Sequence, residues 1–265
     1  QNVNFNAGFW GKLKNQMTFN YWFNLSPKSI DYFEARQEGK QFKYPLNYNA
    51  GINFQLDPRK KMSSAFFIYL IQIPKWKNSY YEFSISPIYK INSHLNLSLN
   101  TSFGYGNNEY GYNFTKSDGS FGKRNTQTLN NSIYIAINFT PKSNLTFGTR
   151  HYWSKIWYYS FYKLNDDGSL NIDPEYKHNA DLSQNYFNLD CIYTWEFAPG
   201  SFLNLIWKNS LNRYQESNDI IKSENYIDNV KGTFSSPQHN AITLKLIYFI
   251  DYNQARKAFN KKHYK

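Results

Sequence analysis

Residues 46–57, which read LNYNAGINFQLD, decide the fold class of this chain. Every second residue is apolar, and the residues between them are Asn, Gly, Gln or Asp. Because successive side chains of a strand point to opposite faces, this alternation predicts a β-strand with one apolar and one polar face.

The same alternation recurs along the chain, in residues 81–91, 95–105, 129–139, 187–197, 203–212 and 242–252. Each apolar face extends over about ten residues, which is the length a tilted strand needs to cross a bilayer. Aromatic residues often stand at the ends of these faces, as interfacial girdles do. A soluble β-sandwich would also alternate, but its strands average about half this length.

Composition agrees with a membrane barrel. The chain holds 24 Tyr, 22 Phe and 7 Trp, yet its mean hydropathy is −0.71. A barrel reconciles the two, because every second residue meets lipid and the others meet water. The predicted fold is therefore all-β, a transmembrane antiparallel up-and-down β-barrel. About eleven strands are visible, and since single-chain barrels have an even number we expect a larger barrel of about 12 to 16 strands.

The connections alternate between short and long. Short turns fall near residues 10–12, 57–61, 92–93, 141–144 and 198–200, and long polar segments near 26–43, 106–126, 160–183 and 214–239. In outer-membrane barrels the short turns are periplasmic and the long loops extracellular. We expect residues 1–252 to form the barrel, with strands or a domain preceding residue 1, and residues 253–265 to form a basic periplasmic tail. The expected location is the bacterial outer membrane.

The net charge is +11, with a pI of about 9.4. Much of the positive charge lies in short turns and in the tail, and no nucleic-acid-binding motif is present. The expected partners are the lipid bilayer and lipopolysaccharide, and not nucleic acid.

Charged residues of the polar class are the candidate functional residues. In a barrel they would face the lumen, where mixed charges either pair and hold the barrel's shape or select what passes. These residues are Glu82, Lys90, Arg150, Asp190, Glu196, Lys208, Lys245 and Asp251.

Residues 62–73, MSSAFFIYLIQI, are an exception because both of their faces are apolar. Such a strand does not suit an open water channel on its inner side. We expect Phe66, Ile68 and Leu70 to pack against an inward loop, a plug or a partner.

Little in the sequence predicts catalysis. No close metal-binding pair of histidines occurs, so no metal and no cofactor are predicted. His178 and Asp181 share one long loop and could form the acid–base pair of a hydrolase, although a solvated polar loop is the simpler interpretation. Cys191 falls in the apolar class and is expected to be a small hydrophobic residue.

The segment 193–207 and the closing strand 241–252 carry a family resemblance. A strand, a Pro-Gly-Ser turn, a strand ending in Trp and a last strand ending in Asp-Tyr resemble the C-terminal barrel of a Bacteroidota family, the domain-of-unknown-function family numbered 5916. The matching positions are Trp195, Pro199, Gly200, Ser201, Leu203, Trp207, Asp251 and Tyr252. The resemblance implies that a carbohydrate-binding-like β-sandwich commonly precedes the barrel, and it implies no settled activity.

Three functions remain open. The first is an outer-membrane anchor or scaffold for an extracytoplasmic domain or protein complex, with other outer-membrane proteins or a missing N-terminal domain as partners. The second is a passive or selective pore for small hydrophilic solutes such as glycans. The third and weakest is a membrane-embedded hydrolase, so the chain is expected not to be an enzyme.

Overall fold

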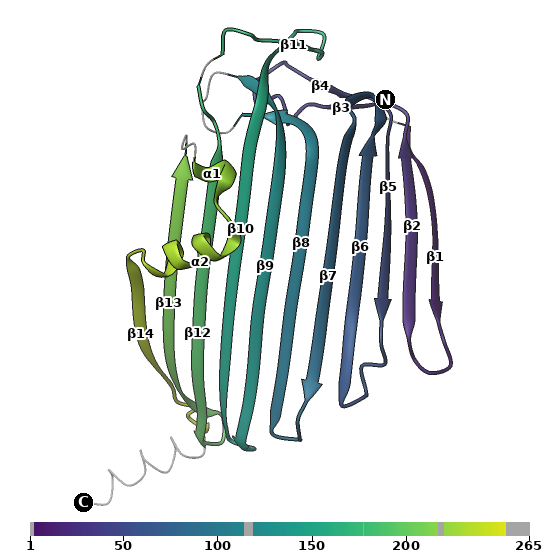
Figure 1. Ribbon diagram of the computed structural model, residues 1–265. Coiled ribbons are helices and arrows are strands. Elements are labelled where there is room, and N and C mark those ends of the chain that lie inside the picture. Colours follow the sequence, from purple (N-terminus) through teal and green to yellow (C-terminus); the bar gives the residue numbers. More distant parts are fainter. Residues whose placement is uncertain (1–2, 114–118, 177, 217–219, 253–265) are drawn as a thin grey trace, which may run out of the picture.

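A computed structural model describes residues 3–113, 119–176, 178–216 and 220–252. These residues form one large antiparallel sheet whose strands follow one another in sequence order (Figure 1). The strands along it are β1 (Phe5–Lys12), β2 (Thr18–Ser26), β5 (Asn47–Gln55), β6 (Met62–Ile73), β7 (Asn78–Lys90), β8 (Leu95–Tyr112), β9 (Ser120–Thr140), β10 (Ser143–Leu164), β12 (Leu182–Ala198), β13 (Ser201–Glu216) and β14 (Gln238–Ile247). The predicted set of about eleven antiparallel strands is confirmed.

Smaller elements gather at one end of the sheet or on its surface. A hairpin of β3 (Ser29–Asp31) and β4 (Phe42–Tyr44) and the short strand β11 (Leu170–Ile172) lie at the top of Figure 1, where β11 pairs with β10. A 3₁₀ turn, η1 (Pro74–Trp76), joins β6 to β7. Two helices not expected from the sequence, α1 (Ile220–Ser223) and α2 (Tyr226–Phe234), lie between β13 and β14.

The strand register separates the side chains into two faces. One cross-strand row runs Asn100, Ser132, Arg150, Asn188, Ser210, and a row on the opposite side runs Leu97, Ile135, Phe147, Cys191, Trp207, Ile242. We call these sides the polar face and the apolar face. The alternation in the sequence therefore holds across neighbouring strands, as the register of a two-faced sheet requires.

The prediction for β6 was wrong in its orientation. Phe66 and Ile68 lie opposite Phe54 and Ile52 of β5, so they and Leu70 belong to the apolar face. The residues that β6 turns toward the polar face are Phe67, Tyr69 and Ile71. Because both sets are apolar, only pairing with the neighbouring strands decides which set faces which way.

The last strand is shorter than expected. It pairs with β13 only as far as Ile247, opposite Phe202, because β13 itself begins at Ser201. Beyond that point the amide of Phe249 donates to Ser201 Oγ at 3.0 Å instead of continuing the ladder. Asp251 therefore lies outside the sheet, and its predicted place on the polar face was wrong. The predicted tail, 253–265, lies outside the described residues.

The buried apolar residues that pack as one cluster lie at one end of the sheet and not along it. Ala35, Phe42, Phe121 and Leu164 form this core, surrounded by Tyr44, Trp76, Tyr110, Tyr112, Tyr162 and Leu170. The rings of Phe42 and Phe121 stack with centroids 4.8 Å apart. We call this unit, formed by β3, β4, β11 and the adjoining ends of β8, β9 and β10, the crown.

Each end strand pairs on one side only. Among the described residues β1 pairs with β2 alone and β14 with β13 alone, and all ten residues of β14 are exposed. No helix in the described part of the chain is long and apolar enough to cross a membrane.

Candidate functional site

The middle of the polar face carries a trough lined by amides, hydroxyls and one guanidinium. A hollow of about 560 Å³ lies there between β8, β9, β10 and β12. Tyr152 and Tyr186 stand side by side at it, with ring centroids 6.2 Å apart. The remaining lining includes Asn100, Ser102, Asn130, Ser132, Arg150 and Asn188. The amides and hydroxyls donate and accept hydrogen bonds, whereas the guanidinium of Arg150 is positively charged and only donates.

Three of the predicted charged residues come together beside this trough. Asp190 lies between Arg150, at 3.6 Å, and Lys208, at 3.7 Å, on three neighbouring strands. The two cations remain mostly exposed, and ion pairs of this kind contribute about 0–1 kcal/mol each. The negative charge of Asp190 is thus balanced by two positive charges on the neighbouring strands.

The other predicted charges are scattered over the same face. Glu82 accepts from the Tyr80 hydroxyl at 3.1 Å, near the crown end. Lys90 donates to the carbonyl of Pro58 at 2.7 Å, in a turn at the other end. Glu196 accepts from the amide of Gly200 at 3.1 Å, and Lys245 lies opposite Asn204 on β14. The structure does not bring these four residues into one ring.

An aromatic cluster on the polar face was not predicted. Trp22 packs against Phe67 and Tyr69, with centroids 5.9 and 6.3 Å apart, and Tyr69 meets Tyr80 at 6.3 Å. Gly51 lies opposite Trp22 in the register, and its missing side chain leaves the space that the indole ring fills. The sequence signal was the two-sided apolar character of residues 62–73 together with a glycine in the neighbouring strand.

Above this cluster, acidic and basic groups line a second hollow of about 490 Å³ beneath the crown. Glu34 accepts from the amide of Tyr112 at 2.9 Å, and Arg124 donates to the carbonyl of the same residue at 3.0 Å. Asp31, in the same hairpin, accepts from the amides of Phe33 and Glu34. The Glu34 bond holds the β3–β4 hairpin against β8, the Arg124 bond ties β9 to β8, and the Asp31 bonds lie within the hairpin.

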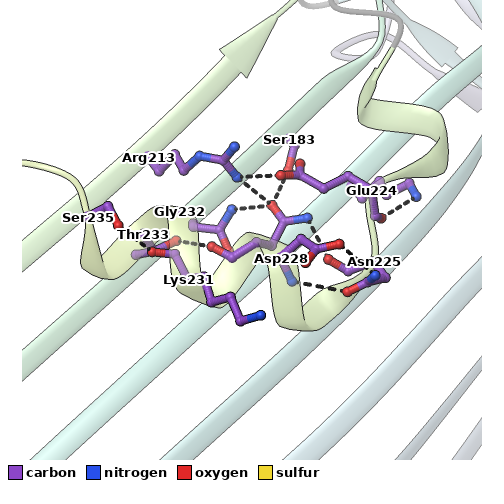
Figure 2. Close-up of polar contacts among 12 residues, drawn as sticks. Ser183, Arg213, Glu224, Asn225, Asp228, Lys231, Gly232, Thr233 and Ser235 are labelled. Carbon is purple, nitrogen blue, oxygen red and sulfur yellow. Dashed lines mark hydrogen bonds and ion pairs between the residues drawn. The ribbon is translucent and has the colours of Figure 1, made fainter.

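The two helices lie against the apolar face, over β10, β12 and β13, near the crown end (Figures 1 and 2). Arg213 of β13 pairs with Glu224 at 2.9 Å and also donates to Asn229 Oδ1 at 3.2 Å. The same Oδ1 accepts from Ser183 and Asn185 of β12. We call residues 220–236 the helical cover, because they close over side chains that would otherwise leave polar groups on the apolar face.

The ends of the cover are fixed by polar bonds too. Asn225 caps α2, since its side-chain oxygen accepts from the amide of Asp228 at 3.0 Å. Lys155 donates to the carbonyl of Glu224 at 3.1 Å, and the Tyr226 hydroxyl lies within hydrogen-bond distance of Asn131 and His151. The Asn-x-x-Asp spacing of the cap was the sequence signal for this helix.

The residues of the family turn have structural positions. Gly200 has a φ of 71°, which a residue with a side chain rarely adopts, and it follows Pro199 in the turn between β12 and β13. Ser201 is almost fully buried and holds the Phe249 amide. Trp195 and Trp207 belong to the apolar face, and the indole of Trp207 donates to Asn240 at 3.1 Å.

His178 and Asp181, considered as the acid–base pair of a hydrolase, each have other contacts in the described part of their loop. Within the described residues, His178 meets Tyr176 edge to face at 5.5 Å and forms no ion pair with a carboxylate. Asp181 is buried and accepts from the amide of Tyr158 at 2.8 Å. A search of the described ranges finds no group of three or more His, Cys, Asp or Glu residues placed to hold a metal ion.

Comparison with known proteins gives a similar solved structure and a matching family. Among solved structures, the copper transporter OprC has a similar fold, with a TM-score of 0.50 at 9% sequence identity. The similarity covers 92% of this chain and 41% of OprC, so the chain spans about two fifths of that protein's length. No curated protein sequence matches. Residues 1–259 match the family described as "Domain of unknown function (DUF5916)", and the chain belongs to that family.

Proposed function

We propose that this chain forms part of the wall of an outer-membrane β-barrel that serves as an anchor and scaffold for an extracytoplasmic partner. The observation that carries the proposal is the crown. It is a packed unit with its own buried core, built at one end of the sheet, and other buried apolar side chains of the described residues, such as Trp153, Leu211 and Ile221, do not belong to it. Rigid, folded connections at one rim are suited to holding another protein or domain, whereas most loops are mobile.

The polar face supports the same proposal. The aromatic cluster of Trp22, Phe67, Tyr69 and Tyr80 would be an unusual lining for a wide aqueous channel. A protein segment lying in the lumen would cover it. The charges of Arg150, Asp190 and Lys208 are already paired, so they do not form a ring of one sign.

The apolar face of the sheet supports the proposed membrane placement. In a bilayer every backbone polar group needs a partner, so the single-sided strands β1 and β14 require pairing there. The long connections at the crown end correspond to the extracellular side of an outer-membrane barrel, and the short turns to the periplasmic side. This orientation belongs to the proposal.

A pore for small hydrophilic solutes is the second candidate. The trough between Asn100 and Asn188 favours it, because its amides, hydroxyls and paired tyrosines match the polar groups and ring faces of a sugar.

Ion conductance in a planar bilayer separates the two functions. If the full-length protein is a scaffold, we expect no persistent steps of ion current, either with or without sugars in the solution. Stable steps that change in ion selectivity when Asp190 is replaced by Asn would contradict the scaffold and support the pore. The variant Asp228→Asn, which lies in the helical cover and not on the polar face, is the matched control.

A further inference from the structure

The helical cover is polar where it meets the sheet. Asn229 and Thr233 are fully buried, and Asn229 bonds to Ser183, Asn185 and Arg213. Figure 2 shows Ser183 and Arg213 reaching toward the helix that carries Thr233. A helix on the surface of a soluble protein shows the opposite pattern, with its apolar side packed and its polar side outward. The position of the apolar side of α2 therefore needs a separate explanation.

Four apolar residues share one side of α2. Tyr226, Val230 and Phe234 follow one another at four-residue spacing, and Ile227 lies three residues before Val230 and seven before Phe234. Ile227 is 58% exposed and Phe234 is 49% exposed. Asp228 is also exposed but lies on another side of the helix, whereas Lys231 follows Ile227 by four residues and flanks the apolar side.

The apolar side is turned toward the middle of the sheet and away from the crown. Asn229 contacts Ser183 and Asn185. Phe234 packs on Phe187, which is two residues further from the crown along β12, with ring centroids 5.0 Å apart. Tyr226 packs on His151, which lies in the same cross-strand row as Phe187, and on Trp153, which lies in the row of Asn185. The apolar side of α2 thus continues the apolar face of the sheet.

The height of the helix matches the margin of a bilayer. Below Phe187, the apolar face of β12 continues through Leu189, Cys191, Tyr193, Trp195 and Phe197. About ten steps of roughly 3.3 Å, tilted by about 40°, span about 25 Å, the height of the apolar band of an outer-membrane barrel. The helix stands where that band ends.

We propose that α2 is an interfacial helix that inserts Ile227 and Phe234 into the acyl-chain margin of the outer leaflet, while its polar back shields the polar patch of Ser183, Asn185 and Arg213 from lipid. The occupant of this surface is lipid and not a second protein. This inference rests on the proposed membrane placement of the sheet. Short amphipathic helices that lie along a membrane surface bind in the same way.

The test measures whether lipid or water reaches a fluorescent label at a single position. In a Cys191→Ser background, Ile227→Cys, Asp228→Cys and Ile133→Cys are each labelled with an environment-sensitive fluorophore in the full-length protein. The proteins are reconstituted in phosphatidylcholine vesicles whose acyl chains carry a nitroxide near the glycerol end. We expect the label at Ile227 to be quenched by the nitroxide and protected from aqueous iodide, and the label at Asp228 to show the reverse.

The outcomes are distinguishable. Iodide quenching at Ile227 equal to that at Asp228 would overturn the inference, and so would protection of Ile227 from both quenchers, which would mean a protein cover. Ile133 lies on the apolar face of β9 and is 41% exposed, so it reports the membrane placement itself. If Ile133 is not quenched from the lipid, the barrel proposal fails. If Ile133 is quenched and Ile227 is not, only the role of α2 fails.

Discussion

At the residue scale, the polar face depends on one close approach between a ring and a strand. The indole of Trp22 lies over Gly51, and a Cβ at that position would overlap the ring. Glycine is required there for space and not for backbone conformation. The contact allows Trp22 to stack with Phe67 and Tyr69 and keeps all three rings close to the wall.

Gly51→Val is therefore expected to lower the free energy of unfolding by about 1–3 kcal/mol, because a crowded packed site must shift to admit the side chain. Urea unfolding in detergent, followed by tryptophan fluorescence, measures the change. Gly148→Ala is the control, since a Cβ there meets only Tyr134, at 3.8 Å. Equal stability of the two variants would show that Trp22 does not occupy this position.

The turn between β5 and β6 holds an ion pair of a different kind. Arg59 donates two hydrogen bonds of 2.9 Å to the Asp57 carboxylate, whose side chain is 7% exposed. These bonds, with one from the Arg59 amide, lower the pKa of Asp57 from 3.8 to about 2. A lowered pKa means that the pair stabilises the fold above pH 3.8 and loses that contribution as the pH falls toward 2.

A carbon-13 NMR titration of the Asp57 carboxyl is expected to give a midpoint near 2 in the native protein and a midpoint closer to 3.8 in Arg59→Ala. The difference in unfolding free energy between the two proteins should be present at neutral pH and absent below pH 2. A native midpoint near 3.8 would contradict the bonded geometry of the turn.

At the scale of elements, the helical cover is held by one amide. Asn229 Oδ1 accepts three hydrogen bonds, from Ser183, Asn185 and Arg213, while its Nδ2 donates to the carbonyl of Asn225. Removal of that acceptor takes a partner from the buried donors of Ser183 and Asn185, which costs about 1–3 kcal/mol for each group, while Arg213 keeps its bond to Glu224. The cost falls on docking of the helix and not on the sheet.

Asn229→Ala is thus expected to increase amide hydrogen exchange throughout α2 while leaving β12 and β13 protected. Lys231→Gln is the matched control, since its side chain is exposed on the same helix. Hydrogen exchange with mass spectrometry measures both. Unchanged protection of α2 in Asn229→Ala would mean that the polar network does not hold the cover.

The crown is a second separable element. Phe42 is fully buried and contacts Tyr44, Trp76 and Phe121. Phe42→Ala is expected to destabilise the crown by about 3–5 kcal/mol, because it leaves a cavity in a small core. Limited proteolysis should then cut within residues 29–44. The rest of the protein should still migrate as the folded form when the sample is run on a gel without heating. Phe33→Ala, in the same hairpin but 89% exposed, is the control, and equal cutting of the two variants would remove the case for a packed crown.

At the scale of the whole molecule, the alternation of residues 46–57 and of its repeats correctly predicts the number, direction and order of the strands. The alternation fails to predict the structure where the two faces do not differ in polarity or where a strand lacks a partner. In residues 62–73 both sets of side chains are apolar, so period two carries no information about orientation. After Ile247 the pattern continues, but the partner strand has ended, so the ladder stops.

Two further features lie in or next to segments that the sequence predicts as long polar connections. The register shifts between Gly106 and Glu109 in β8 and between Tyr158 and Ser160 in β10 exchange the two faces, so alternation breaks there although the strands continue. The helical cover buries polar side chains, and an apolar period of the usual kind is therefore missing where it meets the sheet. Among the predicted charged residues, only the grouping of Arg150, Asp190 and Lys208 gives a cluster, because their strands are neighbours in both sequence and space.

The central claim is that one face of this sheet meets lipid and the other does not. A scan of single cysteines at residues 188–195 of β12 tests it most directly, with a fluorophore at each position and a nitroxide-bearing lipid as quencher. The native Cys191 carries the label at position 191 and is replaced by Ser in the other variants. The account predicts strong quenching at 189, 191, 193 and 195 and weak quenching at 188, 190, 192 and 194, which is a period of two set by the register. Quenching that is uniform along the strand, or that is weak at every position while aqueous iodide reaches both sets, would contradict it.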